Sequence, residues 1–289
     1  MLLMIIDVHA HISNGLLKGL HVNSATISDL EAYARTYDIS KIYLMATYFP
    51  YKKRGVFNND LLTKVIDNPL FSVFASLDVS TNYNTGLIEL ESLAANKRIS
   101  GIKLYPGYQP FNCSDDKINK IYELALSYDL PVVFHCGELH HCCPKELRNN
   151  KCNGNCYIDN NQFMSRPLMM LSVAKAYPDL TIILSHLGNP YFSETRQVMR
   201  ECNNVYTDIS GQFLSGTNED SIVYRAELKK EIEEFIDLPD GAKRLFFGTD
   251  FPIQSYKDSL DLIEMLNISK NDKQKILYEN AKNMLDYSY

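Results

Sequence analysis

The sequence lacks several features that mark particular classes of protein. Its 289 residues include no tryptophan and no apolar run of the roughly 18 residues that a membrane-spanning helix needs. Lys and Arg together number 29 against 35 Asp and Glu, so the formal net charge is −6. Non-specific binding to nucleic acid requires a basic surface, which this balance does not supply. We therefore expect neither a membrane protein nor a nucleic-acid-binding protein.

Export signals and domain linkers are also missing from the pattern. Six apolar residues reach Asp7 with no basic segment before them, which is too short a run for a signal peptide. We therefore expect a cytoplasmic protein, with its seven cysteines mostly free or bound to metal. Length alone permits one large domain or two of about 150 residues. Because no low-complexity tract or charge block divides the chain, a single domain over residues 1–289 is predicted.

Short, nearly continuous apolar segments recur, and a polar or amphipathic stretch follows each of them. Eight are expected to be strands: 4–11, 41–47, 71–77, 101–106, 131–137, 181–188, 205–210 and 244–250. Such composition is typical of parallel strands buried on both faces, and the intervening helical patterns imply βαβ units. Eight strands in one series predict a closed (β/α)₈ TIM barrel rather than an open sheet.

Local patterns predict where some helices begin and where the barrel is interrupted. Thr26 and Asp29 resemble a capping box, Ser114 is expected to cap a helix, and Pro167 suits a first helical position. The one irregular stretch, residues 137–165, follows the fifth strand and is rich in Cys and His. We expect it to be a long insertion loop with a functional role or disorder.

Histidines and aspartates gather at the ends of the predicted strands. The residues concerned are Asp7, His9, His11, His135, His186 and Asp250. Alternation along the first strand puts Asp7, His9 and His11 on one face. The carboxyl ends of barrel strands meet around one cavity, and imidazole with carboxylate suits Zn²⁺ or a similar divalent ion. The pattern predicts a metal site at this rim, although an HxH pair alone is more typical of two histidines with separate structural roles.

Five motifs then identify a family resemblance. They are DVHAH (7–11), GIKLYP (101–106), VVFHCG (132–137), ILSHLGNP (183–190) and GTDFP (248–252). The motifs stand in the same order as in the amidohydrolase superfamily. The chain therefore resembles that superfamily, most closely its amidohydrolase-related branch of shorter barrels. The resemblance implies a metal-dependent enzyme that acts on a carbonyl, ester, amide or carboxylate centre.

The resemblance also implies roles for individual residues. The implied metal ligands are His9, His11, His135 and Asp250, with His186 as a further ligand or poised over the bound water or substrate. A divalent ion lowers the pKa of bound water from 15.7 to about 7. Asp250 could accept the proton of that water and return it to the leaving group, while His186 orients the water or stabilises an oxyanion.

Three roles are possible for Lys103, which lies in the fourth predicted strand. In binuclear members of the superfamily a lysine of this strand is carboxylated and bridges two metal ions. The shorter-barrel branch usually works with one ion, and we favour that count here. Lys103 then contacts substrate or an oxyanion as a catalytic residue, or it forms a structural ion pair.

The insertion loop offers a second candidate metal site, which the family resemblance does not cover. Cys152 and Cys156 have the spacing of a zinc knuckle, and Cys142 and Cys143 lie close by in sequence. A structural zinc on these four cysteines, disulfides, and a flexible loop with free thiols are the alternatives. Cys136 follows His135 and is expected to point away from the catalytic metal.

Substrate contacts are the least determined part of the sequence. Tyr105 shares its strand face with Lys103 nearer the rim, and Arg166 could pair with an anionic substrate or be a surface residue. Tyr48 and Tyr51 could wall the pocket or pack their loop. With 19 tyrosines in the chain, a tyrosine near the pocket is expected by chance.

Three functions fit these observations. The compact chain and its intact HxH pair favour a hydrolase that uses metal-activated water on a small ester, lactone or amide. The alternative is a non-oxidative decarboxylase of the same superfamily, and the third is a non-catalytic barrel, which the complete ligand set argues against. A small-molecule substrate is expected in either enzyme, and the chain could form a homo-oligomer.

Overall fold

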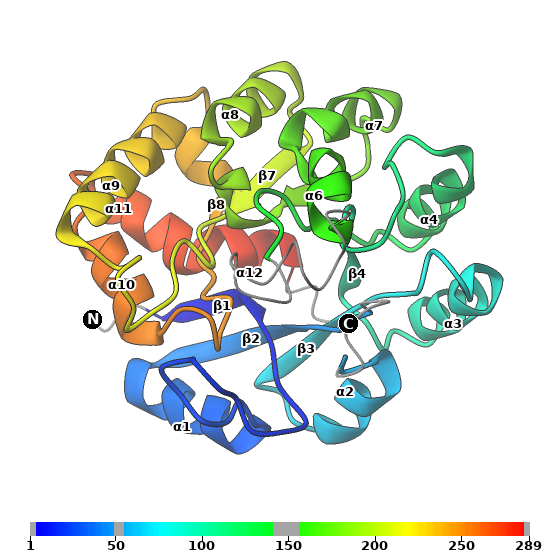
Figure 1. Ribbon diagram of the computed structural model, residues 1–289, viewed down its shortest axis with the longest axis horizontal. Helices are drawn as coiled ribbons and strands as arrows, with labels where there is room; N and C mark the ends of the chain where they lie inside the picture. Colours follow the sequence, from blue (N-terminus) through cyan, green and yellow to red (C-terminus); the bar gives the residue numbers. More distant parts are fainter. Residues whose placement is uncertain (1–3, 49–54, 141–155, 286–289) are drawn as a thin grey trace.

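All eight predicted strands are present in the structure, a computed structural model that describes residues 4–48, 55–140 and 156–285. They are β1 (Ile5–Ala10), β2 (Ile39–Met45), β3 (Phe71–Ala75), β4 (Gly101–Leu104), β5 (Val132–Phe134), β6 (Ile182–Leu184), β7 (Val205–Asp208) and β8 (Leu245–Phe246). Every neighbouring pair is parallel and the order runs from β1 to β8. Figure 1 shows the strands encircled by helices, which confirms the predicted (β/α)₈ barrel.

The barrel closes between β1 and the segment that follows β8. The backbone N–H of His11 donates to the carbonyl of Phe251 at 2.7 Å, and that of Asp250 donates to the carbonyl of His9 at 2.7 Å. A parallel bridge also joins Ala10 to Phe251. The first and last sequence motifs, almost the whole chain apart, therefore lie side by side.

Helices fill most of the connections between strands. The α-helices are α1 (Ile27–Tyr37), α2 (Asn58–Lys64), α3 (Tyr83–Ala95), α4 (Asp116–Ser127), α6 (Tyr157–Asn161), α7 (Leu171–Ala176), α8 (Phe192–Glu201), α9 (Ile222–Ile236), α10 (Tyr256–Glu264), α11 (Lys270–Gln274) and α12 (Asn280–Leu285). Short 3₁₀ turns are η2 (Gln162–Ser165), η3 (Pro167–Met170), η4 (Ser185–Gly188) and η5 (Gly241–Arg244), and η6 (Lys275–Glu279) is a π-helical turn. Among the described segments, no helix has the length and apolarity to cross a membrane.

The helix starts agree with the sequence patterns at two of three places. Thr26 caps α1 in a capping box with Asp29, and Pro167 occupies the first position of η3. Ser114 as the cap of α4 is wrong, because Asp115 is the capping residue and has extended backbone angles. The Asp115 carboxylate accepts a hydrogen bond from the N–H of Asn112 at 3.0 Å, which holds the turn one residue further along the chain.

The expected insertion loop is partly helical. Residues 156–165 carry α6 and η2, so the expectation of irregular chain is wrong for this part, and 141–155 lie outside the described residues. Gln162 anchors the helical part to the end of β5. Its Oε1 accepts from the N–H of Leu139 at 2.8 Å and its Nε2 donates to the carbonyl of Gly137 at 2.9 Å. The insertion is thus joined to the strand that carries His135.

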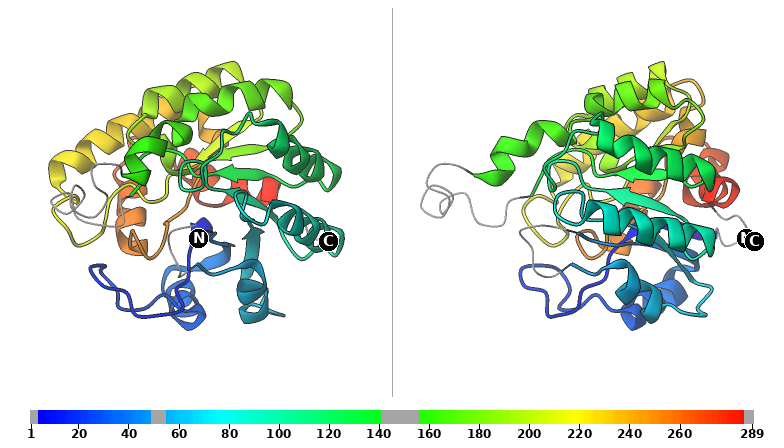
Figure 2. Two further views of the ribbon diagram at one scale, coloured as in Figure 1. Left: turned by 45° about the vertical axis from the view of Figure 1, so that its right-hand side comes forward. Right: turned by 90° about the vertical axis from the view of Figure 1, so that its right-hand side faces the viewer.

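Two sets of apolar side chains hold the barrel together. The outer set packs the sheet against the helices, and the inner set fills the barrel with residues such as Ile6, Val8 and Phe74. Ala281 and Leu285 of α12 join the inner set. Figure 2 shows α12 and α6 on opposite sides of the barrel, so α12 covers the end that lies away from the insertion.

Gly101, at the start of β4, provides a test of this inner packing. An added Cβ atom would lie 2.1 Å from Cε1 of Phe74 and 2.9 Å from the carbonyl oxygen of Pro131. We expect Gly101→Ala to lower the free energy of unfolding, measured in urea, by about 1–3 kcal/mol through overpacking. Gly15→Ala, whose Cβ atom meets nothing within 4 Å, should change it by less than about 0.5 kcal/mol. Equal stability of the two variants would contradict this account.

Candidate metal centre

Two histidines of the β1 motif and an aspartate after β8 bring three potential ligand atoms together. Nε2 of His9 lies 3.6 Å, and Nε2 of His11 lies 3.2 Å, from Oδ1 of Asp250. The two imidazole centroids are 5.4 Å apart. All three ligand atoms fall within 4.8 Å of one another, which is a plausible cradle for one divalent ion.

The first strand reaches this arrangement through an irregularity. Ile6 and Val8 both join the inner cluster, and the pairing of β1 with β2 shifts between Asp7 and Ala10. The expectation that Asp7 shares the face of the histidines is therefore wrong. Its carboxylate instead accepts from the N–H of Thr249 at 3.1 Å and from the Thr249 hydroxyl at 2.7 Å, which ties β1 to the chain after β8.

Asp208, the last residue of β7, is the residue that the sequence reasoning missed. Its Oδ2 accepts from Nδ1 of His9 at 3.0 Å, and its Oδ1 accepts from the backbone N–H of His186 at 3.0 Å. Burial alone would raise the pKa of Asp208, but its electrostatic interaction and hydrogen bond with His9 hold that pKa below its ordinary value. Since an ionised carboxylate only accepts, the proton of neutral His9 is on Nδ1 and the Nε2 lone pair faces Asp250. Burial lowers the pKa of His9 to about 3.

His186 lies in the turn η4 directly after β6. Three successive residues there, His186, Leu187 and Gly188, have positive φ angles of 63°, 55° and 70°. Backbone strain of this kind gathers at functional sites, where the surrounding contacts must hold it. Nδ1 of His186 lies 3.1 Å from the carbonyl oxygen of Ser210, and a carbonyl only accepts. The proton is therefore on Nδ1 and the Nε2 lone pair is available, while burial lowers the pKa of His186 and favours the neutral ring.

His135 directly follows β5 and lies beside these residues without entering the ligand group. Its ring centroid lies 5.1 Å from that of His186, and its Nε2 lies 3.3 Å from the carbonyl oxygen of Glu138. In the part of the chain that the structure describes, the groups of three potential ligand atoms do not include it. If Nε2 donates to that carbonyl, Nδ1 is the atom left to bind a metal. The role of His135 as a ligand stays a prediction.

Asp250 is shaped by both its backbone and its neighbours. It has a positive φ of 53°, and Gly211, with φ 59°, packs against its carboxylate. Burial alone would raise the pKa of Asp250, but the hydrogen bond with His11 and the nearby His186 hold it below its ordinary value. The side chain is therefore an anion that faces Nε2 of His9 and Nε2 of His11, as suits a metal-binding carboxylate.

Lys103 is completely buried in the barrel below these residues. Its Nζ donates to the hydroxyl of Ser185 at 2.6 Å, next to His186 in the chain. Burial lowers the pKa of Lys103 to about 8. The carboxylated, substrate-contacting and structural roles of Lys103 all stay predictions.

The predicted substrate contacts are both engaged within the fold. The hydroxyl of Tyr105 donates to the carbonyl of Ala46 at 2.7 Å. Arg166 is 48% exposed, pairs with Glu194 and stacks over the ring of Tyr191 at 5.0 Å, which agrees with the surface alternative. Both assignments to substrate stay predictions.

The remaining predicted residues fall mainly in segments that the structure does not describe. Cys142, Cys143, Cys152 and Tyr51 lie outside the described residues. Cys156 is described as a buried free thiol that packs with Tyr105 and Tyr108. The structural zinc on the four cysteines stays a prediction.

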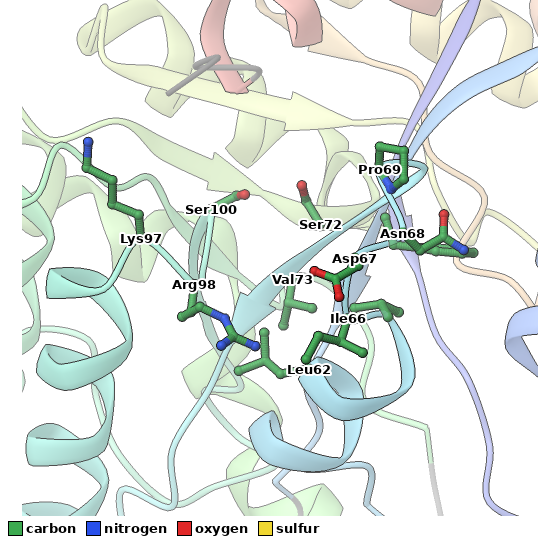
Figure 3. Close-up of a pocket in the computed structure, with 12 residues that line it drawn as sticks. Leu62, Ile66, Asp67, Asn68, Pro69, Ser72, Val73, Lys97, Arg98 and Ser100 are labelled. Atoms are coloured by element: carbon green, nitrogen blue, oxygen red, sulfur yellow. The ribbon is translucent and has the colours of Figure 1, made fainter.

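A separate surface cavity of about 570 Å³ lies near the amino ends of β3 and β4 (Figure 3). Its lining includes Leu62, Asp67, Phe71 and Arg98. Barrel enzymes place their chemistry at the carboxyl ends of the strands, where the histidines lie. The lining also combines charges of both signs, so the cavity lacks the chemistry of the metal centre.

Comparison with known proteins agrees with this geometry. A protein-family model described as Amidohydrolase matches residues 6–287. A curated gamma-resorcylate decarboxylase from Polaromonas sp. is 28% identical over 137 residues. That alignment covers 40% of this chain and only 37% of the decarboxylase, so it spans well under two thirds of the length of the decarboxylase.

Solved structures share the fold along nearly the whole chain. A 5-carboxyvanillate decarboxylase from Sphingomonas paucimobilis has a TM-score of 0.68 and 15% identity, covering 98% of this chain and 99% of its own. A manganese-bound dihydroxybenzoic acid decarboxylase from Polaromonas sp. has a TM-score of 0.66 and 17% identity, covering 98% and 96%. A probable 2-pyrone-4,6-dicarboxylic acid hydrolase from Acinetobacter baumannii has a TM-score of 0.69 and 15% identity, covering 97% and 98%. At these identities the likeness shows the TIM-barrel fold alone.

Gly211 provides a test of the metal centre. An added Cβ atom would lie 2.7 Å from Oδ2 of Asp250 and 3.0 Å from Nδ1 of His186. We expect Gly211→Ala to displace the carboxylate and to weaken Zn²⁺ or Mn²⁺ binding about 10–100-fold, the range seen when supporting contacts of metal ligands are lost. Calorimetric titration of the metal into stripped protein measures this change.

Gly216→Ala is the matched control for that experiment. Gly216 also has positive φ, 76°, but its added Cβ atom would meet only Cβ of His21 at 3.8 Å. The control carries the same kind of backbone strain without the clash, so it should bind metal as wild type does. Equal metal affinity in the two variants would show that Asp250 is not held where the structure places it.

Proposed function

The chain belongs to the amidohydrolase family, and from that premise we propose that it is a metal-dependent decarboxylase of a small hydroxylated aromatic acid. The observation that carries the choice of reaction is the sequence match to gamma-resorcylate decarboxylase. It supports the alternative that the sequence analysis placed second to hydrolysis. The preference for hydrolysis on the ground of a compact chain fails, because the alignment with 5-carboxyvanillate decarboxylase covers 98% of this chain and 99% of that one.

The donor set fits a divalent ion. His9 and His11 would offer Nε2, Asp250 would offer Oδ1, and His135 is the candidate for a further ligand. Two imidazoles and a carboxylate suit Zn²⁺, the ion that we propose, and also Mn²⁺, which one structural neighbour binds. When bound, such an ion holds substrate oxygens in place and withdraws electron density from the reacting centre.

His186 supports decarboxylation of a substrate that carries its own hydroxyl group. With the proton on Nδ1, neutral His186 can only accept a hydrogen bond at Nε2. It can therefore orient a substrate hydroxyl, whereas stabilising an oxyanion would require a donor at that atom. This argues against the oxyanion role that hydrolysis would assign to a neutral His186.

Asp250 is the residue in the site best placed to move a proton. Its Oδ1 faces the two β1 histidines, which leaves Oδ2 for the substrate. As the bond to the carboxylate carbon breaks, its electron pair stays on the ring carbon and CO₂ leaves. The ring carbon must then gain a proton. Because Asp250 is ionised, Oδ2 would first have to take a proton from water, and a carboxyl group whose pKa is held low is then a strong acid that can pass this proton to the ring carbon.

Hydrolysis is kept as a second candidate because of one observation. An ionised Asp250 beside two imidazoles is also the base that activation of a water molecule requires. The structural neighbour described as a pyrone hydrolase shares the same fold. The substrate classes of the two reactions are distinct, so one panel of compounds separates them.

The assay compares both substrate classes on Zn²⁺- and Mn²⁺-loaded protein. We expect 2,6-dihydroxybenzoate or 5-carboxyvanillate to be converted with release of CO₂, because the metal and His186 together can engage a carboxylate beside a hydroxyl. The His9→Ala, His11→Ala double variant should be inactive and should not retain metal. Opening of 2-pyrone-4,6-dicarboxylate or of simple lactones, with no CO₂ from the benzoates, would replace this proposal by the hydrolase.

Asp250→Asn tests the proton transfer. The amide keeps the shape and one metal-binding oxygen but cannot deliver a proton. We expect kcat to fall by about 10²–10⁴-fold, the usual value of general acid–base catalysis. Metal content must be measured in the same sample, since the substitution also weakens a ligand. A metal-replete Asp250→Asn enzyme with near wild-type kcat would assign the proton to another group.

A further inference from the structure

Ser210, two residues after Asp208, is fully buried between the two histidines that present Nε2. Its Oγ lies 2.9 Å from Nδ1 of His186 and 3.1 Å from Nδ1 of His9. The same hydroxyl donates to Oδ1 of Asp208, and the Ser210 N–H donates to that oxygen at 3.1 Å.

The hydrogen count at Ser210 restricts the state of both histidines. A serine hydroxyl has one proton and two lone pairs. Its proton is directed to Asp208, which only accepts, so Oγ presents lone pairs to Nδ1 of His9 and of His186. Each contact is favourable only when that Nδ1 carries a proton, because two facing lone pairs repel each other.

We propose that Ser210 is a positioning residue that fixes the proton of both His9 and His186 on Nδ1 and so keeps both Nε2 lone pairs directed into the metal centre. Asp208 also accepts from Nδ1 of His9, and the carbonyl of Ser210 also contacts Nδ1 of His186. Only the Ser210 hydroxyl, among the side chains that the structure describes, contacts both rings and Asp208 at once. It therefore makes the orientations of the two rings depend on each other.

The geometry of the strand ends explains why this position is suited to the role. His9 lies in β1 and His186 follows β6, with ring centroids 4.8 Å apart. The Ser210 segment follows β7, and Gly211 beside it packs against the Asp250 carboxylate. One short stretch of chain thus contacts both imidazoles and approaches the third potential ligand.

The inference deepens the proposed function, since it concerns how that centre is prepared to bind metal. Its test measures proton position and Zn²⁺ affinity rather than turnover. A chain that failed to decarboxylate the benzoates would leave these readouts unaffected, so the two proposals fail separately.

The first measurement needs no substitution. In full-length, metal-stripped protein labelled with ¹⁵N-histidine, the ring nitrogens report which atom carries the proton, and single His→Gln variants assign His9 and His186. We expect both rings to have the proton on Nδ1. Finding the proton of either ring on Nε2 would overturn the proposal, whatever the variants show.

The second measurement compares Ser210→Ala with Ser76→Ala. Ser76 is also fully buried, and its hydroxyl has no hydrogen-bond partner in the described residues, so its truncation removes the same atom without the contacts. We expect Ser210→Ala to weaken Zn²⁺ binding about 10–100-fold and to shift part of the His186 population to a proton on Nε2. Ser76→Ala should match wild type in both. Wild-type Zn²⁺ affinity and proton positions in Ser210→Ala would overturn the proposal.

Discussion

The buried carboxylate of Asp208 is the contact on which the organisation of the site depends. A buried charge is costly unless hydrogen bonds and opposite partial charges surround it. Asp208 accepts from the ring of His9, from the backbone of His186 and from Ser210, which come from three different strand ends. The need to satisfy one anion therefore brings β1, β6 and β7 into a single arrangement, and removing any donor would leave part of that charge unpaired.

The closure of the barrel supplies the remaining part of the site. Hydrogen bonds between β1 and the chain after β8 put Asp250 beside His9 and His11. Asp7 strengthens this contact through Thr249, so a residue outside the ligand set still determines where the ligands lie. The positive φ angles of His186 and Asp250 are held in place by these same contacts. The strained backbone angles and the hydrogen bonds that hold them are therefore parts of the same arrangement.

Much of the fold could be predicted because its signal is repeated along the chain. Eight apolar segments separated by helical patterns allow few architectures other than a parallel barrel, and a residue at the end of a strand must then lie at the rim. His9, His11, His186 and Asp250 were found in this way, and Asp208 ends its strand in the same manner. Asp208 is not among the residues that the resemblance implies, and its role depends on which ring nitrogen of His9 it contacts. Spacing alone carries no information about that atom.

The errors have local physical causes. Asp7 does not share the face that regular alternation predicts, because the register of β1 shifts before Ala10. The helix start near Ser114 moved by one residue because Asp115 bonds the turn before it. In the insertion, Gln162 holds a helical segment through bonds to two distant backbone groups. In each case the outcome depends on a hydrogen bond or a shift of strand register that the local spacing of residue types does not show.

The choice between the two reactions depends on protons more than on the metal. Either reaction could use the same ligands and the same aspartate, so the ligand set does not separate them. The state of His186 restricts them, because a neutral ring that carries its proton on Nδ1 can accept at Nε2, from a substrate hydroxyl or a water molecule, but cannot donate to an oxyanion there. The negative charge that an attacking water builds on a carbonyl oxygen gains nothing from such an acceptor, although the water itself could donate to it. A substrate with a hydroxyl beside its carboxylate gains an orienting hydrogen bond, and its reaction then needs one proton on carbon, which the Asp250 carboxyl can deliver. The contact between Ser210 and His186 therefore bears on the reaction as well as on the metal.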